Sequence, residues 1–201
     1  MAAIQVLLHK LNLPILRDWL VYRVAAVLII SHLFIRKYMY RKCPQEYRLN
    51  QDEVVIVTGS SSGIGICAAK EFICRGGKVV WACRNTRSAN DELDSIAWQP
   101  GFGTKGYVLS LDLADKASIE HFVDEFKKRE TQLNVLVLNA GVNTSGSRRV
   151  TKDGFEESIG VNHLGHMYLT YLLGDMLKSS ATPEQPARVI VVASDLHRLA
   201  R

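Results

Sequence analysis

Hydrophobic positions along the chain fall into two alternating patterns. Five short apolar runs, rich in valine and isoleucine, have the length and composition of β-strands that are covered on both faces. Between them lie longer stretches in which apolar residues recur every three or four positions, as in a helix that buries one side. The expected strands are residues 53–58, 78–82, 106–111, 135–138 and 189–193.

The clearest helical pattern follows Asp115, which is placed to cap a helix with three cationic residues in its last turn. Asp153 and Glu156 have the spacing of a capping box at the start of a later, long helix. The apolar stripe after Asp115 consists of Ile119, Phe122, Val123 and Phe126. The predicted helices are residues 64–75, 87–97, 116–129 and 155–178.

Strands that alternate with helices predict βαβ units and therefore an α/β fold with a parallel sheet. Right-handed crossovers then produce a Rossmann-type, doubly wound sheet, with the strand order 3-2-1-4-5. In this order the strand over 189–193 is an uncovered edge. We expect a sheet that is incomplete at the C-terminus, preceded by an N-terminal hydrophobic helix.

The N-terminal segment contains an apolar stretch between Trp19 and Tyr38. As a helix it would cover about 30 Å, the hydrocarbon thickness of a bilayer, and aromatic residues lie at both ends. Arg23 interrupts it, close enough to one end to reach the interface. We expect a membrane anchor, and an interfacial helix or a helix packed on the body are the alternatives. The predicted domains are an anchor with a basic linker (1–50) and a nucleotide-binding domain (51–201).

Basic residues are concentrated in the same segment. Residues 1–42 hold seven lysines and arginines against Asp18 alone, whereas the rest holds 18 basic and 19 acidic residues. The folded body thus lacks the positive surface of a nucleic-acid-binding protein. By the positive-inside rule, the positive flank after the apolar stretch predicts that the body lies in the cytosol. The membrane that we expect is that of the endoplasmic reticulum. The four cysteines have no zinc spacing, which favours reduced and mostly buried thiols.

A glycine-rich loop, Thr58-Gly-Ser-Ser-Ser-Gly-Ile-Gly65, joins the first strand to the first helix. Small residues there let the backbone approach a diphosphate, which the N–H groups and dipole of the helix N-terminus would bind. No Gly-Lys-Ser/Thr follows, so the loop is not a P-loop. The residues expected to bind the cofactor here are Gly59, Ser61, Ser62, Gly63, Ile64 and Gly65.

Arg84 follows the second strand, 19 positions after Gly65. In NAD-binding folds an acidic residue at this point receives the ribose 2′-hydroxyl. A cation instead favours a 2′-phosphate, so we expect NADP(H), with NAD(H) less favoured, and Ser61 and Ser62 as further donors. The alternative is a surface arginine without a ligand.

These motifs resemble the short-chain dehydrogenase/reductase family from Val54 to the C-terminus. The resemblance implies that Asp112, in Leu-Asp-Leu, meets the adenine amino group. It also implies that Asn139 and Ala140, in Leu-Asn-Ala-Gly, lie near the cofactor ribose, and that Gly141 permits close approach.

Two further stretches, Thr-Lys-Asp-Gly-Phe-Glu and Val-Asn-His-Leu-Gly-His, are similar to the retinol dehydrogenase branch and to oxidoreductases that carry WW domains. By this resemblance Asn162 is the catalytic asparagine that holds a water in a proton relay. Ser194, after the last strand, is the catalytic serine that hydrogen-bonds the substrate carbonyl. His163 and His166 are read as polar or packed helix residues and not as metal ligands.

The family's Tyr-x-x-x-Lys, expected on a helix after Ser194, does not occur there, and Tyr38 to Lys42 matches its spacing by chance. We therefore expect either a shortened or incompletely recorded membrane-associated oxidoreductase, or a non-catalytic cofactor-binding or interaction module. For the enzyme, the resemblance implies a lipophilic alcohol or carbonyl, with retinoids and steroids as candidates, and a homodimer in a full-length form.

Overall fold

The structure is a computed structural model that describes residues 22–24, 26–32, 49, 53–97, 106–144 and 148–194. The chain divides into two compact units, residues 1–47 and 48–201. In the first unit, residues 22–24 and 26–32 are helical and exposed. In the described part of the sequence, no helix combines the length and the apolar character that crossing a membrane requires. The rest of the predicted anchor lies outside the described residues.

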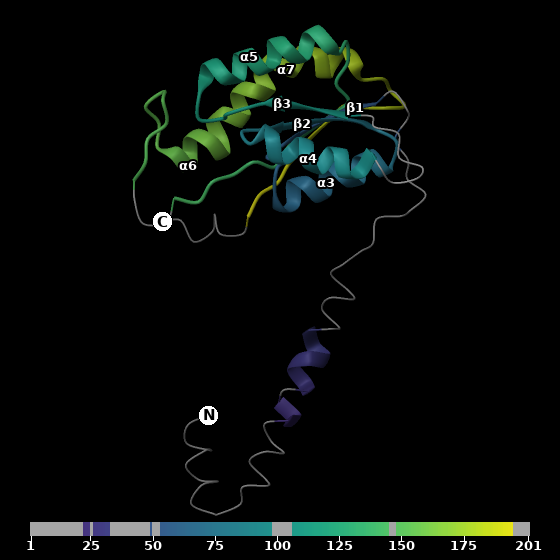
Figure 1. Cartoon of the computed structure of the whole chain (residues 1–201), viewed down its shortest axis with the longest axis vertical. Coiled ribbons are helices and arrows are strands. Elements are labelled where there is room, and N and C mark those ends of the chain that lie inside the picture. The colour runs from purple at the N-terminus through teal and green to yellow at the C-terminus, as the bar shows by residue number, and fades with distance from the viewer. Residues whose placement is uncertain are drawn as a thin grey trace, which may run out of the picture. The chain divides into compact units, whose positions relative to one another are not determined.

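The second unit is built on a five-stranded parallel sheet with the order β3-β2-β1-β4-β5 (Figure 1). This confirms the predicted α/β class and the 3-2-1-4-5 order of a Rossmann-like fold. The middle strand β1 pairs with β2 on one side and with β4 on the other. The strands are β1 (Val54–Thr58), β2 (Lys78–Cys83), β3 (Gly106–Ser110), β4 (Val135–Leu138) and β5 (Arg188–Val191).

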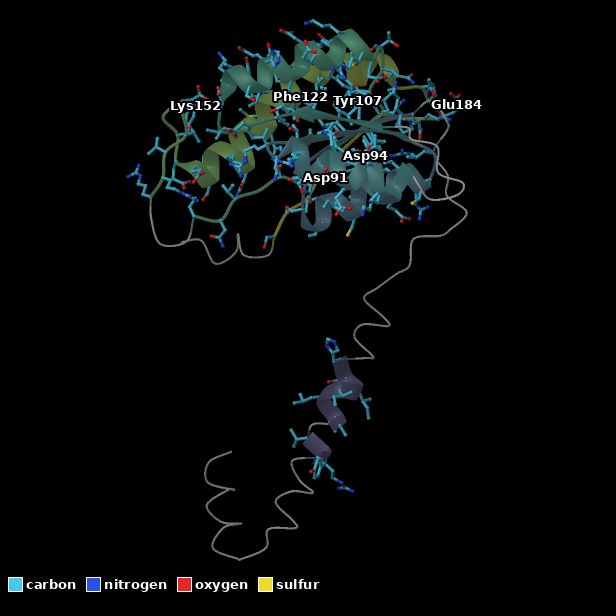
Figure 2. The ribbon with its side chains drawn as sticks, viewed as in Figure 1. Asp91, Asp94, Tyr107, Phe122, Lys152 and Glu184 are labelled. Carbon is cyan, nitrogen blue, oxygen red and sulfur yellow. The ribbon has the colours of Figure 1, made fainter. Side chains whose placement is uncertain are left out.

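Helices cover both faces of the sheet (Figure 1). The core accordingly has two halves, because alternate side chains of each strand point to opposite faces. The covering helices are α3 (Gly63–Cys74), α4 (Thr86–Ala97), α5 (Lys116–Arg129) and α7 (His166–Ser180). In β1, Ile56 packs into the half that includes α5 and α7, and Val55 into the half that includes α3 and α4. Asp91 and Asp94 are exposed on the outer side of α4 (Figure 2).

The N-terminus of α5 is capped as the sequence predicts. Asp115 Oδ1 accepts hydrogen bonds from the N–H groups of Ala117 (3.1 Å) and Ser118 (3.4 Å). All four residues of the predicted apolar stripe are buried, and the last turn is cationic. The cap, the apolar stripe and the cationic last turn predicted for this helix are therefore confirmed.

The long helix predicted over 155–178 is confirmed as a continuous helical stretch over residues 157–180, but it differs from the prediction in two respects. It is divided into α6 (Glu157–Ile159), a π-helical segment η1 (Gly160–Gly165) and α7. The capping box does not form, because Asp153 Oδ2 instead accepts from the Lys116 N–H at 2.9 Å, at the start of α5. Glu156 alone caps α6: its Oε1 accepts from the Ser158 N–H and its Oε2 from the Ile159 N–H, at 2.9 Å each.

Among the described residues, β5 is the outer strand on the β4 side of the sheet, as the predicted order places it. It pairs with β4, and its apolar side chains are partly or largely exposed, with Val191 at 67%. The expectation of mostly buried thiols is wrong for α3. Cys67 and Cys74 are exposed because Gly65, Ala69 and Ile73 form its buried side; Cys83 is buried, and Cys43 lies outside the described residues.

Candidate functional site

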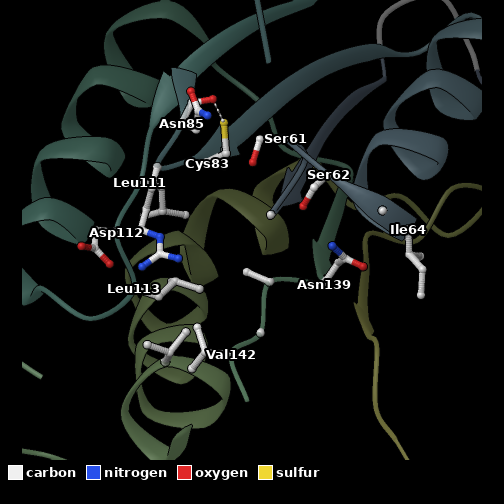
Figure 3. A pocket seen from close by; sticks show the side chains of 17 residues that line it. Ser61, Ser62, Ile64, Cys83, Asn85, Leu111, Asp112, Leu113, Asn139 and Val142 are labelled. Atoms are coloured by element: carbon white, nitrogen blue, oxygen red, sulfur yellow. Dashed lines mark hydrogen bonds between the residues drawn. The ribbon is translucent and has the colours of Figure 1, made fainter. Parts of the chain in front are cut away.

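A cavity of about 390 Å³ opens at the carboxyl edge of the sheet (Figure 3). Its walls come from the β1–α3 loop and from the segments that follow β2, β3 and β4. Parallel α/β folds bind ligands at this edge, in the crevice where the strand order reverses. In this sheet the reversal lies between β1 and β4, beside the first strand. Ten residues predicted for cofactor binding line it: Gly59, Ser61, Ser62, Gly63, Ile64, Arg84, Asp112, Asn139, Ala140 and Gly141.

The glycine loop owes its shape to backbone conformations that glycine adopts without strain. Gly59 has φ 69° and Gly63 has φ 56°, both in the left-handed region. A Cβ at Gly59 would also lie 2.8 Å from Ala140 Cα. Gly65 does not line the cavity but lies behind the loop, where a Cβ would be 2.2 Å from the Gly59 carbonyl oxygen. Its role is thus to let α3 start close to the loop.

The N-terminus of α3 points its donors at the cavity. Ser62 is the N-cap residue, but its side chain makes no capping hydrogen bond, and the first turn carries no acidic residue. The Ser62 side chain therefore accepts no hydrogen bond from the first N–H groups of this 12-residue helix. The positive end of the helix dipole faces the cavity as well. This arrangement fits the diphosphate of a dinucleotide.

The end of β2 contributes a cation and a buried thiol. Arg84 is exposed at the wall of the cavity. Before it, the Cys83 thiol donates to the Asn85 carbonyl at 3.4 Å, and burial raises the pKa of this thiol. Asn85 Oδ1 accepts from the Ser88 N–H at 3.2 Å and so holds the start of α4. The backbone around Arg84 is thereby fixed while its guanidinium remains accessible.

The segment after β4 is tied to β1 through Thr58. The Thr58 Oγ1 accepts from the N–H groups of Asn139 at 2.9 Å and Ala140 at 3.0 Å. In return the Asn139 Nδ2 donates to the Thr58 carbonyl at 2.9 Å. These bonds continue the pairing of the two strands beyond their ends and place Asn139 and Ala140 at the cavity.

Asp112 stands at the end of β3, on the same rim. Its Oδ1 accepts from the Ala114 N–H at 3.0 Å, and its own N–H donates to Ser118 Oγ at 3.0 Å. The carboxylate is therefore held in one orientation at the wall of the cavity, which Leu113 also lines.

The two predicted catalytic residues lie outside the set that lines the cavity among the described residues. Asn162 belongs to η1, and its side chain accepts from the Val142 N–H at 2.8 Å and donates to the Val142 carbonyl at 2.9 Å. A Cβ at Gly141 would be 3.5 Å from its Oδ1, so Asn162 borders the cavity. Ser194 is exposed. It lies two residues after Val192, whose N–H donates to the Leu138 carbonyl at 3.0 Å.

Sequence reasoning missed the part that His166 plays beside this site. His163 is exposed, but the ring of His166 is buried and hydrogen-bonds Thr58. A signal was present, because Leu169, Leu173 and Leu177 continue a helical spacing that places residue 166 on the buried side. Within the described part of the chain, no group of three or more His, Cys, Asp or Glu side chains could hold a metal ion.

Comparison with known proteins agrees with this geometry. Residues 53–199 match the short chain dehydrogenase family. The chain is 44% identical over 146 residues to a WW domain-containing oxidoreductase of Homo sapiens, covering 73% of this chain and 34% of that protein. It is 39% identical over 180 residues to human polyprenol dehydrogenase (90% and 54% covered) and 42% identical over 152 residues to human retinol dehydrogenase 12 (74% and 45%).

Solved structures with the same architecture include complexes with nicotinamide cofactors. RhlG of Pseudomonas aeruginosa, in an NADP active-site complex, has 26% identity and a TM-score of 0.58, covering 68% of this chain and 52% of that one. A 3-ketoacyl-(acyl-carrier-protein) reductase from Brucella melitensis, complexed with NADH, has 25% identity and a TM-score of 0.61 (74% and 59%). The chain spans about a third to a half of the length of the curated relatives it matches.

Proposed function

This chain belongs to the short chain dehydrogenase family, and on that premise we propose that it forms the NADP(H)-binding part of an oxidoreductase for a lipophilic alcohol or carbonyl. The observation that carries the proposal is the cavity at the sheet edge, where the α3 N-terminus and Arg84 meet. A dinucleotide needs an anion site for its diphosphate and a selective contact for its adenosine ribose, and this cavity supplies groups for both.

Arg84 supports NADP(H) over NAD(H). It follows the second strand at the point where an acidic residue would accept the 2′-hydroxyl of NAD. An exposed guanidinium there can form charge-assisted, bidentate hydrogen bonds with a 2′-phosphate. Ser61 and Ser62, on the neighbouring loop, offer hydroxyl donors to the same group.

The remaining residues have distinct parts in this proposal. When bound, the nicotinamide cofactor supplies or accepts the hydride. The backbone of Asn139 and Ala140 orients its ribose, and Asp112 accepts from the adenine amino group. Asn162 orders water beside the reacting centre, and the Ser194 hydroxyl donates to the substrate carbonyl oxygen, which develops negative charge during reduction.

The names of the relatives support a lipophilic substrate, because they include a polyprenol dehydrogenase and retinol dehydrogenases. We further propose that the protein associates with the membrane of the endoplasmic reticulum through its N-terminal segment, with the body in the cytosol, and that a full-length form assembles as a homodimer. The basic flank Arg36, Lys37, Arg41 and Lys42 supports this orientation.

The cofactor proposal is tested by reversing one charge. Arg84→Asp should lower the affinity for NADPH relative to NADH by roughly 10–100-fold, since a hydrogen bond to a charged group contributes about 1.5–3 kcal/mol. Fluorescence titration with both cofactors measures the ratio. Arg87→Asp is the matched control, because Arg87 is exposed on α4 and does not line the cavity. Equal wild-type affinities for NADH and NADPH, or equal effects of the two variants, would refute the role of Arg84.

A further inference from the structure

The buried ring of His166 joins two parts of the site that are far apart in the sequence. His166 is 5% exposed, and its Nε2 lies 2.9 Å from the Oγ1 of Thr58, 108 positions earlier in the chain. On the other side of the ring, Nδ1 lies 3.1 Å from the carbonyl oxygen of Asn162. One imidazole therefore connects the end of β1, at the cavity, with the π-helical segment that carries Asn162.

The partners of the ring decide where its proton lies. A carbonyl oxygen only accepts hydrogen bonds, so Nδ1 must carry the hydrogen that bonds Asn162. In a neutral ring Nε2 is then an acceptor, and the Thr58 hydroxyl donates to it. Burial lowers the pKa of His166, which favours the neutral ring, although the hydrogen bond to the Asn162 carbonyl opposes this shift.

The hydroxyl of Thr58 is fully used in this arrangement. It has one hydrogen and two lone pairs, and the two lone pairs receive the N–H groups of Asn139 and Ala140. The hydrogen has two acceptors in reach, His166 Nε2 at 2.9 Å and the Val137 carbonyl at 3.3 Å. When this hydrogen points to His166, the two lone pairs of the Thr58 oxygen point to the N–H groups of Asn139 and Ala140. A doubly protonated ring would present a donor to an oxygen with no lone pair to spare.

The ring also stabilises the π-helical segment that carries Asn162. The backbone N–H of His166 donates to the His163 carbonyl, three residues earlier. The His166 side chain donates to the carbonyl of Asn162, four residues earlier. The side chain of Asn162 in turn holds both backbone groups of Val142. The ring therefore stabilises the turn that presents Asn162 as well as the Thr58 hydroxyl.

We propose that His166 is a positioning residue, which as the neutral Nδ1–H tautomer orients the Thr58 hydroxyl and thereby holds the Asn139–Ala140 backbone in place for the cofactor ribose. Its relevance to the cofactor rests on the proposed function, whereas the hydrogen-bond arrangement stands without it. His166 touches neither cofactor nor substrate in this proposal and acts through Thr58.

Two conservative variants separate the two bonds of the ring. In His166→Gln, the side-chain Oε1 can replace the Nε2 acceptor for Thr58; in His166→Asn, the Nδ2 can replace the Nδ1 donor for Asn162. Titration with NADPH should give an affinity within about twofold of wild type for the glutamine variant and about fivefold weaker for the asparagine variant, the effect of one net hydrogen bond. Thr170→Val is the control, because the Thr170 hydroxyl donates at 2.8 Å to the His166 backbone carbonyl and not to the ring.

If the wild type binds neither NADPH nor NADH, the proposed function is refuted. Two measurements without cofactor still test the positioning role of His166 in that case. In the full chain, long-range ¹H–¹⁵N spectra of the His166 ring should show the neutral Nδ1–H tautomer at pH 7. Hydrogen exchange of the Asn139 and Ala140 amides should be faster in His166→Asn than in His166→Gln. An Nε2–H tautomer, an imidazolium at pH 7, or equal exchange and equal NADPH affinity in the two variants would overturn the positioning role.

Discussion

Gly65 provides the sharpest test of how the glycine loop is built. A Cβ at this position would lie 2.2 Å from the Gly59 carbonyl oxygen and 2.7 Å from Asn139 Nδ2. Both atoms are held in place, Gly59 by the bond from its N–H to the Ala82 carbonyl (2.8 Å) and Asn139 by Thr58. Since unstrained contacts of carbon require about 3.5 Å, the start of α3 would have to move by roughly 1 Å.

Gly65→Ala should therefore destabilise the fold and weaken cofactor binding. Overpacking costs about 1–3 kcal/mol, and the higher helix propensity of alanine offsets about 0.5–1 kcal/mol of this. We expect a net loss of about 1–2 kcal/mol in the free energy of unfolding. Because the N–H donors of the α3 N-terminus move with the helix, the affinity for NADPH should fall by about tenfold, the effect of losing about 1.4 kcal/mol from one hydrogen bond to a charged phosphate.

Gly174→Ala is the matched control. Gly174 lies inside α7, and a Cβ there would meet no atom within 4 Å. This substitution should raise the free energy of unfolding by about 0.5–1 kcal/mol without changing cofactor affinity. Denaturant unfolding and NADPH titration measure both quantities. Wild-type stability and affinity in Gly65→Ala would show that close packing of α3 on the loop is not required.

Two further predictions concern the α5 cap and the N-terminal segment. The hydrogen bond from Lys152 lowers the pKa of Asp115, so this carboxylate contributes stability above its unfolded pKa of about 4, and the contribution is lost as the pH falls through the lower folded pKa. Thermal melts followed by circular dichroism should show a smaller loss of stability on acidification in Asp115→Asn than in wild type, and equal losses would contradict the role of the pair. Deletion of residues 1–42 should release the protein from membranes in cell fractionation. A full chain that stays in the soluble fraction, or that resists protease on intact microsomes, would refute the proposed anchor and its orientation.

The sequence by itself determined the elements whose signals are local. Valine and isoleucine runs predicted all five strands, and the stripe after Asp115 predicted α5 with its cap, because strand and helix periodicities are set by backbone geometry alone. The glycine loop could also be placed from the sequence, since Gly59 and Gly63 adopt left-handed backbone conformations that favour glycine. Ten of the eleven predicted cofactor residues accordingly line one cavity.

Only the tertiary structure decided which distant groups satisfy one another. Asp153 has the local spacing of a cap, yet it bonds Lys116, because the loop before α6 folds against the start of α5. The predicted long helix becomes π-helical where Gly165 packs so closely that a Cβ would lie 2.5 Å from the Leu113 carbonyl oxygen. The His166 ring donates to the Asn162 carbonyl and accepts from the Thr58 hydroxyl. A buried polar group must be paired, but its partner is chosen by the folded arrangement and leaves no periodic trace in the sequence.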